Sequence, residues 1–134
     1  MIKEKTGLVG QTDEVERVGS YGEKQVARML SRYRIQYEYE YPMAVRDRGK
    51  VRVWYPDFWL PDYGIAIEYV GGISSADYIA GVAHKRAVYE AAGIPCIFVE
   101  HDMLRGNWPD QIAKQIRCVL KERFMKFERF ISEL

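Results

Sequence analysis

The chain has 134 residues, of which 48% are hydrophobic and 29% are charged. These values are typical of a single globular domain, and they exclude a disordered or low-complexity protein. Twenty Lys and Arg against nineteen Asp and Glu leave a formal net charge of +1. Any polyanionic partner must therefore be bound by a local basic patch, because the molecule as a whole is nearly neutral.

Neither targeting nor redox chemistry is indicated by the composition. The longest strongly apolar run without charge, residues 91–99, is too short to cross a bilayer, and the N-terminus has no apolar segment of signal-peptide length. We therefore expect an intracellular protein of the cytoplasm or nucleoid, with no membrane partner. Cys96 and Cys118 each lie among apolar residues. Two cysteines form neither a zinc site nor a disulfide framework, so both are expected to be reduced packing residues.

The first half of the chain predicts an arm, a helix and three strands. Residues 1–16 have mixed charge and little periodicity, so an irregular arm is expected before a single domain over residues 17–134. Apolar residues at helical spacing predict a helix over 20–33, with its buried face at Val26, Met29, Leu30 and Tyr33. Alternation predicts a half-buried strand over 35–43. A charged turn over 46–50, a strand over 51–60, a turn over 61–64 and a β-branched strand over 65–70 follow.

The second half predicts a helix, a buried strand and a long amphipathic helix. Ser75 is a plausible N-cap for a helix over 76–92, which Gly93 would end. The continuous apolar run 94–100 predicts a fully buried strand. The last helix begins at about Pro109, and its apolar stripe comprises Ile112, Ile116, Val119, Leu120, Phe124, Phe127 and Ile131. The order αβββαβα predicts an α/β fold in which a mixed sheet is flanked by helices, because the three-strand meander is antiparallel and the next helix can be a crossover.

Two acidic residues occupy positions that a purely structural strand would fill differently. Asp57 lies among large apolar residues in the second predicted strand, and Glu68 lies inside the third. Acids are depleted in strands and are costly to bury without a partner. Either one alone can simply face solvent. On adjacent antiparallel strands, however, the two can lie side by side, where a divalent cation would keep both ionised.

Two residues on the predicted helices are candidate companions of this pair. Glu23 follows Ser20 at the spacing of a capping box, so its carboxylate either caps the first helix or points towards a neighbouring metal. Lys85 lies in the middle of the second helix's sheet-facing stripe, which comprises Tyr78, Val82, Lys85, Tyr89 and Ala92. It can extend past the edge of the core, or it can bring a positive charge to the carboxylates.

Taken together, these residues resemble the PD-(D/E)XK nuclease superfamily. The resemblance covers residues 20 to about 102. It consists of the helical glutamate in Gly22-Glu23, the Pro56-Asp57 pair, and the strand glutamate Glu68, which ten residues separate from Asp57. It implies a restriction-endonuclease-like αβββαβ core, here with an added C-terminal helix. The subgroup that the chain most resembles includes relatives of very-short-patch repair endonucleases and archaeal Holliday-junction resolvases.

The chain departs from the family pattern at Val70. The family has a lysine two residues after the glutamate, whereas this chain has Val70 there. Several subgroups resemble this chain in supplying the lysine from the following helix, where Lys85 stands. The departure also leaves room for a catalytically inactive nuclease-like fold that binds DNA or another protein. A third hypothesis makes His101 and Asp102 a reactive pair, although such a pair after a strand is more often a turn.

The resemblance implies a divalent-metal-dependent endonuclease that hydrolyses DNA phosphodiester bonds, with Holliday junctions or repair and recombination intermediates among its candidate substrates. Asp57, Glu68 and the main-chain carbonyl of Tyr69 would bind Mg²⁺ or Mn²⁺, with Glu23 bound directly or through water. Lys85 would orient the nucleophile or neutralise developing charge. No organic cofactor is expected.

Two further surfaces are expected to bind partners. The segment 46–52 has a local excess of positive charge that suits phosphate contacts, although a solvated hairpin tip would look the same. Its basic residues are Arg46, Arg48, Lys50 and Arg52. The apolar C-terminal half of the last helix is a candidate homodimer interface. It contains Phe124, Phe127, Phe130 and Ile131.

Overall fold

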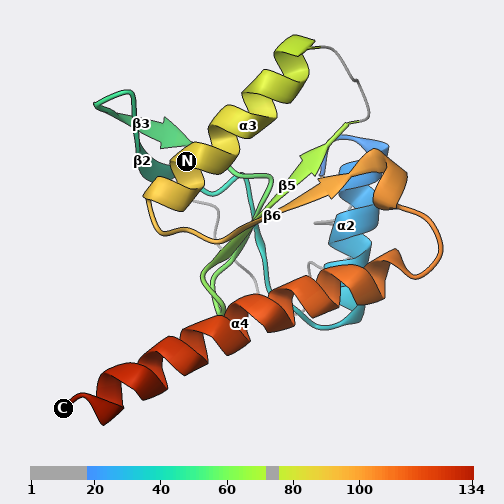
Figure 1. Ribbon diagram of the computed structural model, residues 1–134. Helices are drawn as coiled ribbons and strands as arrows, with labels where there is room; N and C mark the ends of the chain where they lie inside the picture. The colour runs from blue at the N-terminus through green and yellow to red at the C-terminus, as the bar shows by residue number, and fades with distance from the viewer. Residues whose placement is uncertain (1–17, 72–75) are drawn as a thin grey trace.

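The computed structural model describes residues 18–71 and 76–134. Within these ranges the chain is α/β, with three α-helices, a mixed four-stranded sheet and a separate two-stranded sheet (Figure 1). The elements are α2 (Tyr21–Arg32), β1 (Glu38–Tyr39), β2 (Met43–Asp47), β3 (Lys50–Trp54), β4 (Phe58–Leu60), β5 (Ile65–Val70), α3 (Ala76–Ala91), β6 (Cys96–Glu100), a short 3₁₀ helix (His101–Met103) and α4 (Trp108–Ser132). The expected arm over 1–16 and the expected cap Ser75 lie outside the described residues.

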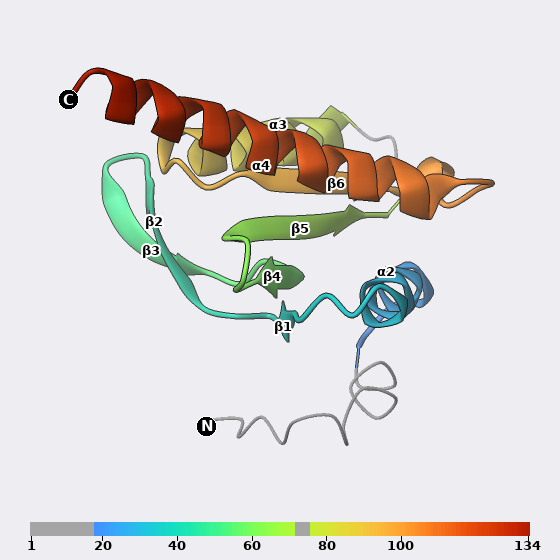
Figure 2. The same cartoon turned by 90° about the horizontal axis from the view of Figure 1, so that it is seen from below.

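The main sheet has the strand order β1-β4-β5-β6, which Figure 2 shows one strand below another. β1 pairs with β4 and β4 with β5 in antiparallel fashion, whereas β5 and β6 are parallel. A parallel neighbour requires a crossover, and α3 provides it. The predicted mixed sheet, with its antiparallel meander and helical crossover, is therefore confirmed.

The prediction of one continuous strand over residues 35–43 is wrong. Only Glu38 and Tyr39 belong to the main sheet, and Glu40 has the left-handed φ of 54°. That backbone conformation turns the chain out of the sheet. The chain then forms β2 in the two-stranded sheet, so the unbroken alternation of side chains conceals a change of sheet.

The predicted strand over 51–60 is also interrupted. β3 ends at Trp54 and β4 begins at Phe58, with Pro56 between them. Proline has no N–H to donate to a sheet ladder, so the strand cannot continue through it. Asp57 consequently lies immediately before β4 and not inside a strand. The predicted charged turn is narrower than expected: only Arg48 and Gly49 form it, both at positive φ, as a two-residue hairpin loop allows.

The main sheet separates two groups of side chains. Ile65 and Ile67 of β5 belong to the core formed with α2 and α4, which includes Leu30 and Ile112. Glu68 points to the opposite face, where α3 contacts it. This alternation follows from the period of two along a strand. The carboxylate face of the sheet is thus the α3 face.

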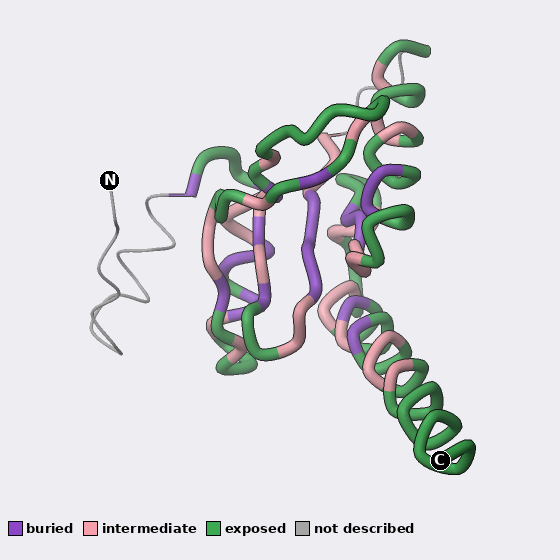
Figure 3. The backbone as a smooth tube through the Cα atoms, turned by 90° about the vertical axis from the view of Figure 1, so that its left-hand side faces the viewer, coloured by how far each residue is buried: buried purple, intermediate pink, exposed green. Residues whose placement is uncertain are grey.

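The three helices agree with their predicted positions but not with all of their predicted faces. Val26, Met29 and Leu30 of α2 are buried as expected, whereas Tyr33 remains 46% exposed. In α4, burial is confined to the first half of the helix, and the second half extends beyond the rest of the molecule (Figure 3). Across the described parts of the chain, no helix combines the length and the apolar character needed to cross a membrane.

Candidate functional site

Asp57, just before β4, and Glu68, near the end of β5, lie next to each other at the end of this strand pair that is remote from the connecting turn. The last antiparallel pair is Phe58 with Ile67, so the register sets Asp57 opposite Glu68. The Asp57 main-chain N–H donates to Glu68 Oε1 at 3.2 Å, and the Tyr69 N–H donates to Asp57 Oδ2 at 2.7 Å. Each carboxylate therefore accepts a hydrogen bond from the other strand's backbone. The expected side-by-side placement is confirmed.

Helix α3 adds two donors to Glu68 from above the sheet. Lys85 Nζ lies 2.9 Å from Glu68 Oε2, and the Tyr89 hydroxyl donates to Glu68 Oε1 at 3.1 Å. The Glu68 side chain is only 5% exposed, whereas that of Lys85 is 50% exposed. Burying a carboxylate is unfavourable unless it is paired and hydrogen-bonded, and these donors supply both conditions. The structure thus brings Lys85 to the carboxylates, as one of its two predicted roles requires.

Asp57 is the member of the cluster whose ionised form is disfavoured. Burial and then the neighbouring Glu68 charge raise the pKa of Asp57 from 3.8 to about 7, in spite of the Tyr69 hydrogen bond. Burial opposes the charged form of Lys85, but Glu68 and Asp57 outweigh it and raise the pKa of Lys85 above its ordinary value. Lys85 is therefore an ammonium group at neutral pH, yet a single cation does not compensate two adjacent carboxylates.

Glu23 approaches the pair from α2. The Ser20 hydroxyl accepts from the Glu23 N–H at 3.2 Å, which makes Ser20 the N-cap of α2. The Glu23 carboxylate accepts a hydrogen bond from the Tyr39 hydroxyl at 2.6 Å, and its charge also raises the pKa of Asp57. Glu23 thus contributes its backbone to the cap and directs its carboxylate towards β1 and the site.

A metal ion would find few side-chain ligands here. Among the described residues there is no group of three or more His, Cys, Asp or Glu side chains that could hold one. A cation bound by Asp57 and Glu68 would need main-chain oxygen and water in addition, which is a ligand set that suits Mg²⁺. The raised pKa of Asp57 is the observation that fits such an ion, because added positive charge would favour the ionised carboxylate.

The Tyr69 carbonyl is the main-chain oxygen best placed for that role. Ala66 bonds to Pro95 of the neighbouring segment, so the alternate residues of β5, including Tyr69, direct their backbone groups towards β4. Continued by two residues, the β4–β5 register sets Tyr69 opposite Pro56. Pro56 has no N–H to donate. The same proline that ends the strand therefore leaves the ladder without a donor for the Tyr69 carbonyl beside Asp57.

A cleft runs between α3 and the ends of β5 and β6. One cavity of about 270 Å³ is lined by Glu68, Lys85 and Tyr78, and another of about 430 Å³ is lined by Tyr78, Arg86 and His101 among others. Both cavities lie at the carboxyl ends of the two parallel strands, where ligand sites of α/β proteins often occur. Glu68 and Lys85 thus lie in the wall of this cleft, whereas Asp57 lines neither of the two cavities.

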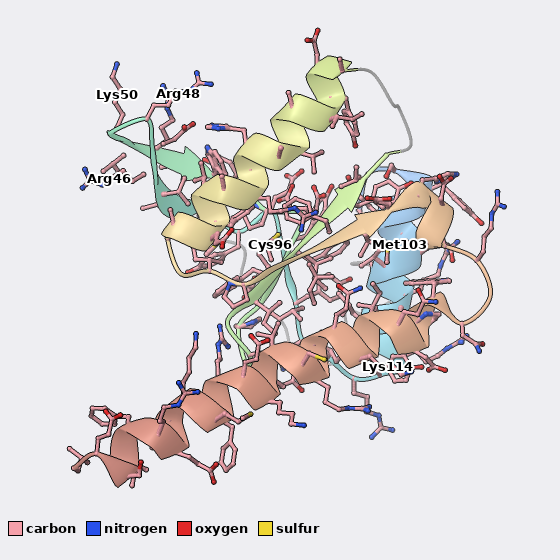
Figure 4. The ribbon with its side chains drawn as sticks, viewed as in Figure 1. Arg46, Arg48, Lys50, Cys96, Met103 and Lys114 are labelled. Carbon is pink, nitrogen blue, oxygen red and sulfur yellow. The ribbon has the colours of Figure 1, made fainter. Side chains whose placement is uncertain are left out.

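The basic residues lie on the hairpin of β2 and β3. Figure 4 shows Arg46, Arg48 and Lys50 projecting from the hairpin's outer end. Arg52 is oriented differently, because its Nε lies 3.8 Å from Asp47 Oδ2. Three of the four predicted basic residues therefore surround the tip, and the fourth pairs with an acid of the same hairpin.

Several partners of the site were missed by sequence reasoning. Asp47 Oδ1 lies 2.8 Å from His84 Nε2, which ties the hairpin to α3 one residue before Lys85. His101 Nδ1 lies 2.8 Å from the Tyr69 hydroxyl, so His101 contacts Tyr69. Tyr89 was predicted only as a packing residue of the α3 stripe. Its place one helical turn after Lys85 was the available signal that it also reaches Glu68.

Searches of protein-family models, curated proteins and solved structures found no match to this chain.

Proposed function

We propose that this protein is a divalent-metal-dependent endonuclease that hydrolyses DNA phosphodiester bonds, with a restriction-endonuclease-like core. The observation that supports it most directly is the contact of Lys85 with Glu68. The chain resembles the PD-(D/E)XK superfamily but has Val70 where that family has its lysine. A lysine that reaches Glu68 from the next helix would take the place of the lysine that is missing at Val70.

The arrangement of elements supports the same proposal. When the hairpin of β2 and β3 is set aside, α2, β1, β4, β5, α3 and β6 follow one another in the order αβββαβ. The hairpin is an insertion between the first two strands of the meander. α4 is then the added C-terminal helix.

The chain's own residues would divide the work as follows. Asp57, Glu68 and the Tyr69 carbonyl would hold Mg²⁺ or Mn²⁺, and Glu23 would support them through water. The ion would lower the pKa of a bound water and polarise the scissile phosphate. Lys85, half-exposed and charged at neutral pH, would position the phosphate or neutralise charge that develops on it. Tyr89 would keep Glu68 oriented.

The basic hairpin tip would bind the DNA backbone. Arg46, Arg48 and Lys50 would each contact phosphates, which fix the position of the duplex without reading its sequence. Trp54 of the hairpin packs edge-on against Tyr89, with ring centroids 5.4 Å apart. The phosphate-binding tip and the carboxylates are therefore supported by the same helix.

The experiment is a cleavage assay with Mg²⁺ or Mn²⁺ and labelled linear, nicked, flap and four-way-junction DNAs. We expect the wild type to cut at least one of them, and Asp57→Asn and Lys85→Met to cut none while still binding DNA. Asp62→Asn is the matched control, because Asp62 is exposed in the turn after β4. Metal-independent cutting, or cutting by Asp57→Asn, would overturn the proposal.

One observation favours the alternative of a catalytically inactive DNA-binding or protein-interaction module. Glu68 already accepts hydrogen bonds from Lys85, Tyr89 and the Asp57 backbone. If these donors hold it permanently, only Oε2 of Glu68 keeps a lone pair for a cation, and the Lys85 ammonium group beside it repels one. Calorimetric titration with Mn²⁺ decides between the two. Binding that disappears in Asp57→Ala supports the nuclease, and absence of binding in the wild type supports the module.

A further inference from the structure

The C-terminal half of α4 carries apolar side chains against which little of the described part of the chain packs. Figures 1 and 3 show this half extending past the sheet and the other helices. Ile112 and Ile116 in the first half are buried in the core, and Leu120 still packs against it. Beyond that point Phe124, Phe127 and Phe130 are 58–60% exposed, and Ile131 is 51% exposed. Large apolar residues so clustered on one overhanging helix mark an interaction surface.

The spacing of these residues specifies the kind of partner. Leu120, Phe124, Phe127 and Ile131 follow one another along α4 at steps of four, three and four, and Leu134 comes three residues later, just after the end of the helix. This is a heptad stripe, the pattern by which one helix packs against another helix. The stripe begins at Leu120, which packs against the core, and from there it runs along the exposed half of α4 beside the face that buries Ile112 and Ile116.

The charges beside the stripe distinguish between the two directions of pairing. Lys121 and Glu128 follow directly after Leu120 and Phe127, so both border the stripe on one side. In an antiparallel pair of α4 helices centred between Phe124 and Phe127, Lys121 of each copy would stand beside Glu128 of the other.

A parallel pair would instead need Arg123 to reach Glu128 of the second copy. Arg123 is already engaged within its own chain, where it donates to the carbonyl oxygens of Tyr63 and Gly64. This engagement ties α4 to the turn after β4. Charge complementarity therefore favours the antiparallel arrangement.

We propose that two copies of this chain associate through antiparallel pairing of residues 120–132 of α4. The three phenylalanine rings, each about 60% exposed, leave about 300 Å² of accessible surface per copy. Together with the aliphatic residues, two helices bury about 1,000 Å², which is at the lower limit for a specific interface. We therefore expect a reversible dimer with a dissociation constant in the micromolar range. The proposal does not depend on nuclease activity.

The experiment is sedimentation equilibrium of the full chain from about 1 to 200 μM, without DNA. The wild type is expected to pass from monomer to dimer over this range. Phe127→Ser should raise the dissociation constant at least 100-fold, because the symmetry places this side chain in the interface twice. Phe127 is 58% exposed in the single chain, so its replacement leaves the fold intact, and circular dichroism checks this. A wild type that stays monomeric over the whole concentration range overturns the proposal. The exposed apolar surface of α4 would then have to bind a different partner.

A charge exchange tests the direction of pairing. Lys121→Glu and Glu128→Lys should each weaken the dimer about tenfold, because each puts like charges side by side. The double variant Lys121→Glu with Glu128→Lys should restore the wild-type dissociation constant. Glu122→Lys, on the opposite side of the helix, is the control and should change nothing. Failure of the double variant to recover, or a dimer unaffected by either single change, would refute the antiparallel arrangement.

Discussion

Replacing Asp57 with Asn should make the metal-free protein more stable at neutral pH. Asn has nearly the same shape, and its amide oxygen can still accept the hydrogen bond from the Tyr69 N–H. It removes only the negative charge that burial and Glu68 oppose. Most substitutions at such a well-connected position destabilise a protein. A gain in stability would therefore identify a residue held in an unfavourable charge state for a functional reason.

The magnitude follows from the pKa of Asp57, which is about 7 in the folded chain and 3.8 ordinarily. The folded state binds more protons than the unfolded state between these two values, so the free energy of unfolding falls as pH rises through this window. Each pH unit of difference corresponds to about 1.4 kcal/mol. With allowance for the partial exposure of Asp57, we expect Asn to add about 2–4 kcal/mol above pH 7, equivalent to about 10 °C in Tm.

Thermal unfolding followed by circular dichroism from pH 4 to pH 8.5, in the presence of a chelator, measures this effect. The difference between Asp57→Asn and wild type should be absent near pH 4 and fully developed above pH 7. Asp62→Asn, at an exposed position, should follow the wild type. If Asp57→Asn is less stable than wild type at pH 8, or if the difference does not vary with pH, the reasoning is wrong. Added Mn²⁺ should raise the Tm of the wild type only.

Three further predictions concern the two α3 donors to Glu68 and the basic tip of the hairpin. Lys85→Met should abolish cleavage and lower the free energy of unfolding by about 1–2 kcal/mol, because Glu68 stays buried without its cation. Single-turnover rates measure the first effect and urea unfolding the second, and full activity would remove Lys85 from the mechanism. Tyr89→Phe should cost about 1–3 kcal/mol in urea unfolding, since it removes a donor from Glu68; an unchanged unfolding midpoint would contradict this. Alanine at Arg46, Arg48 and Lys50 of the hairpin tip should weaken DNA binding. It should also lower the slope of log Kd against log salt by about 0.9 per lost phosphate contact. An unchanged slope would exclude the tip from the DNA-binding surface.

The part of the site that could be predicted from sequence is the part that depends on periodicity. The strand positions of Asp57 and Glu68 and the tight turn between them made cross-strand proximity the natural expectation. The helical spacing in α3 placed Lys85 on the face that covers the sheet. In both cases a local repeat in the sequence was enough to predict which residues would be neighbours. The contacts of Glu68 with Asp57 and with Lys85 confirm these two predictions.

The remaining features depend on where the chain changes direction and on what lies beside it in space. Alternation predicts which side chains share a face while a strand lasts, but it does not show that Glu40 adopts a left-handed backbone. The hydrogen bond from the Tyr39 hydroxyl to Glu23 joins β1 to α2, the helix that precedes it in the chain. No periodicity in the sequence predicts this contact. Likewise, the heptad pattern near Phe127 could not show that the C-terminal half of α4 extends past the sheet and the other helices.

The hairpin of β2 and β3, which is the proposed phosphate-binding arm, is an excursion from the main sheet. The Glu40 N–H donates to the Asp57 carbonyl at 3.2 Å, so the excursion over residues 41–56 leaves and rejoins the sheet at a closed neck. The entropic penalty of closing such a loop grows only slowly with its length. The turn at Arg48 and Gly49 can therefore vary in length or charge while Trp54 keeps its contact with Tyr89 and the register of β4 and β5 is unchanged. On the proposed function, such a change at the tip would alter how the chain holds the DNA backbone and leave the proposed catalytic residues in place.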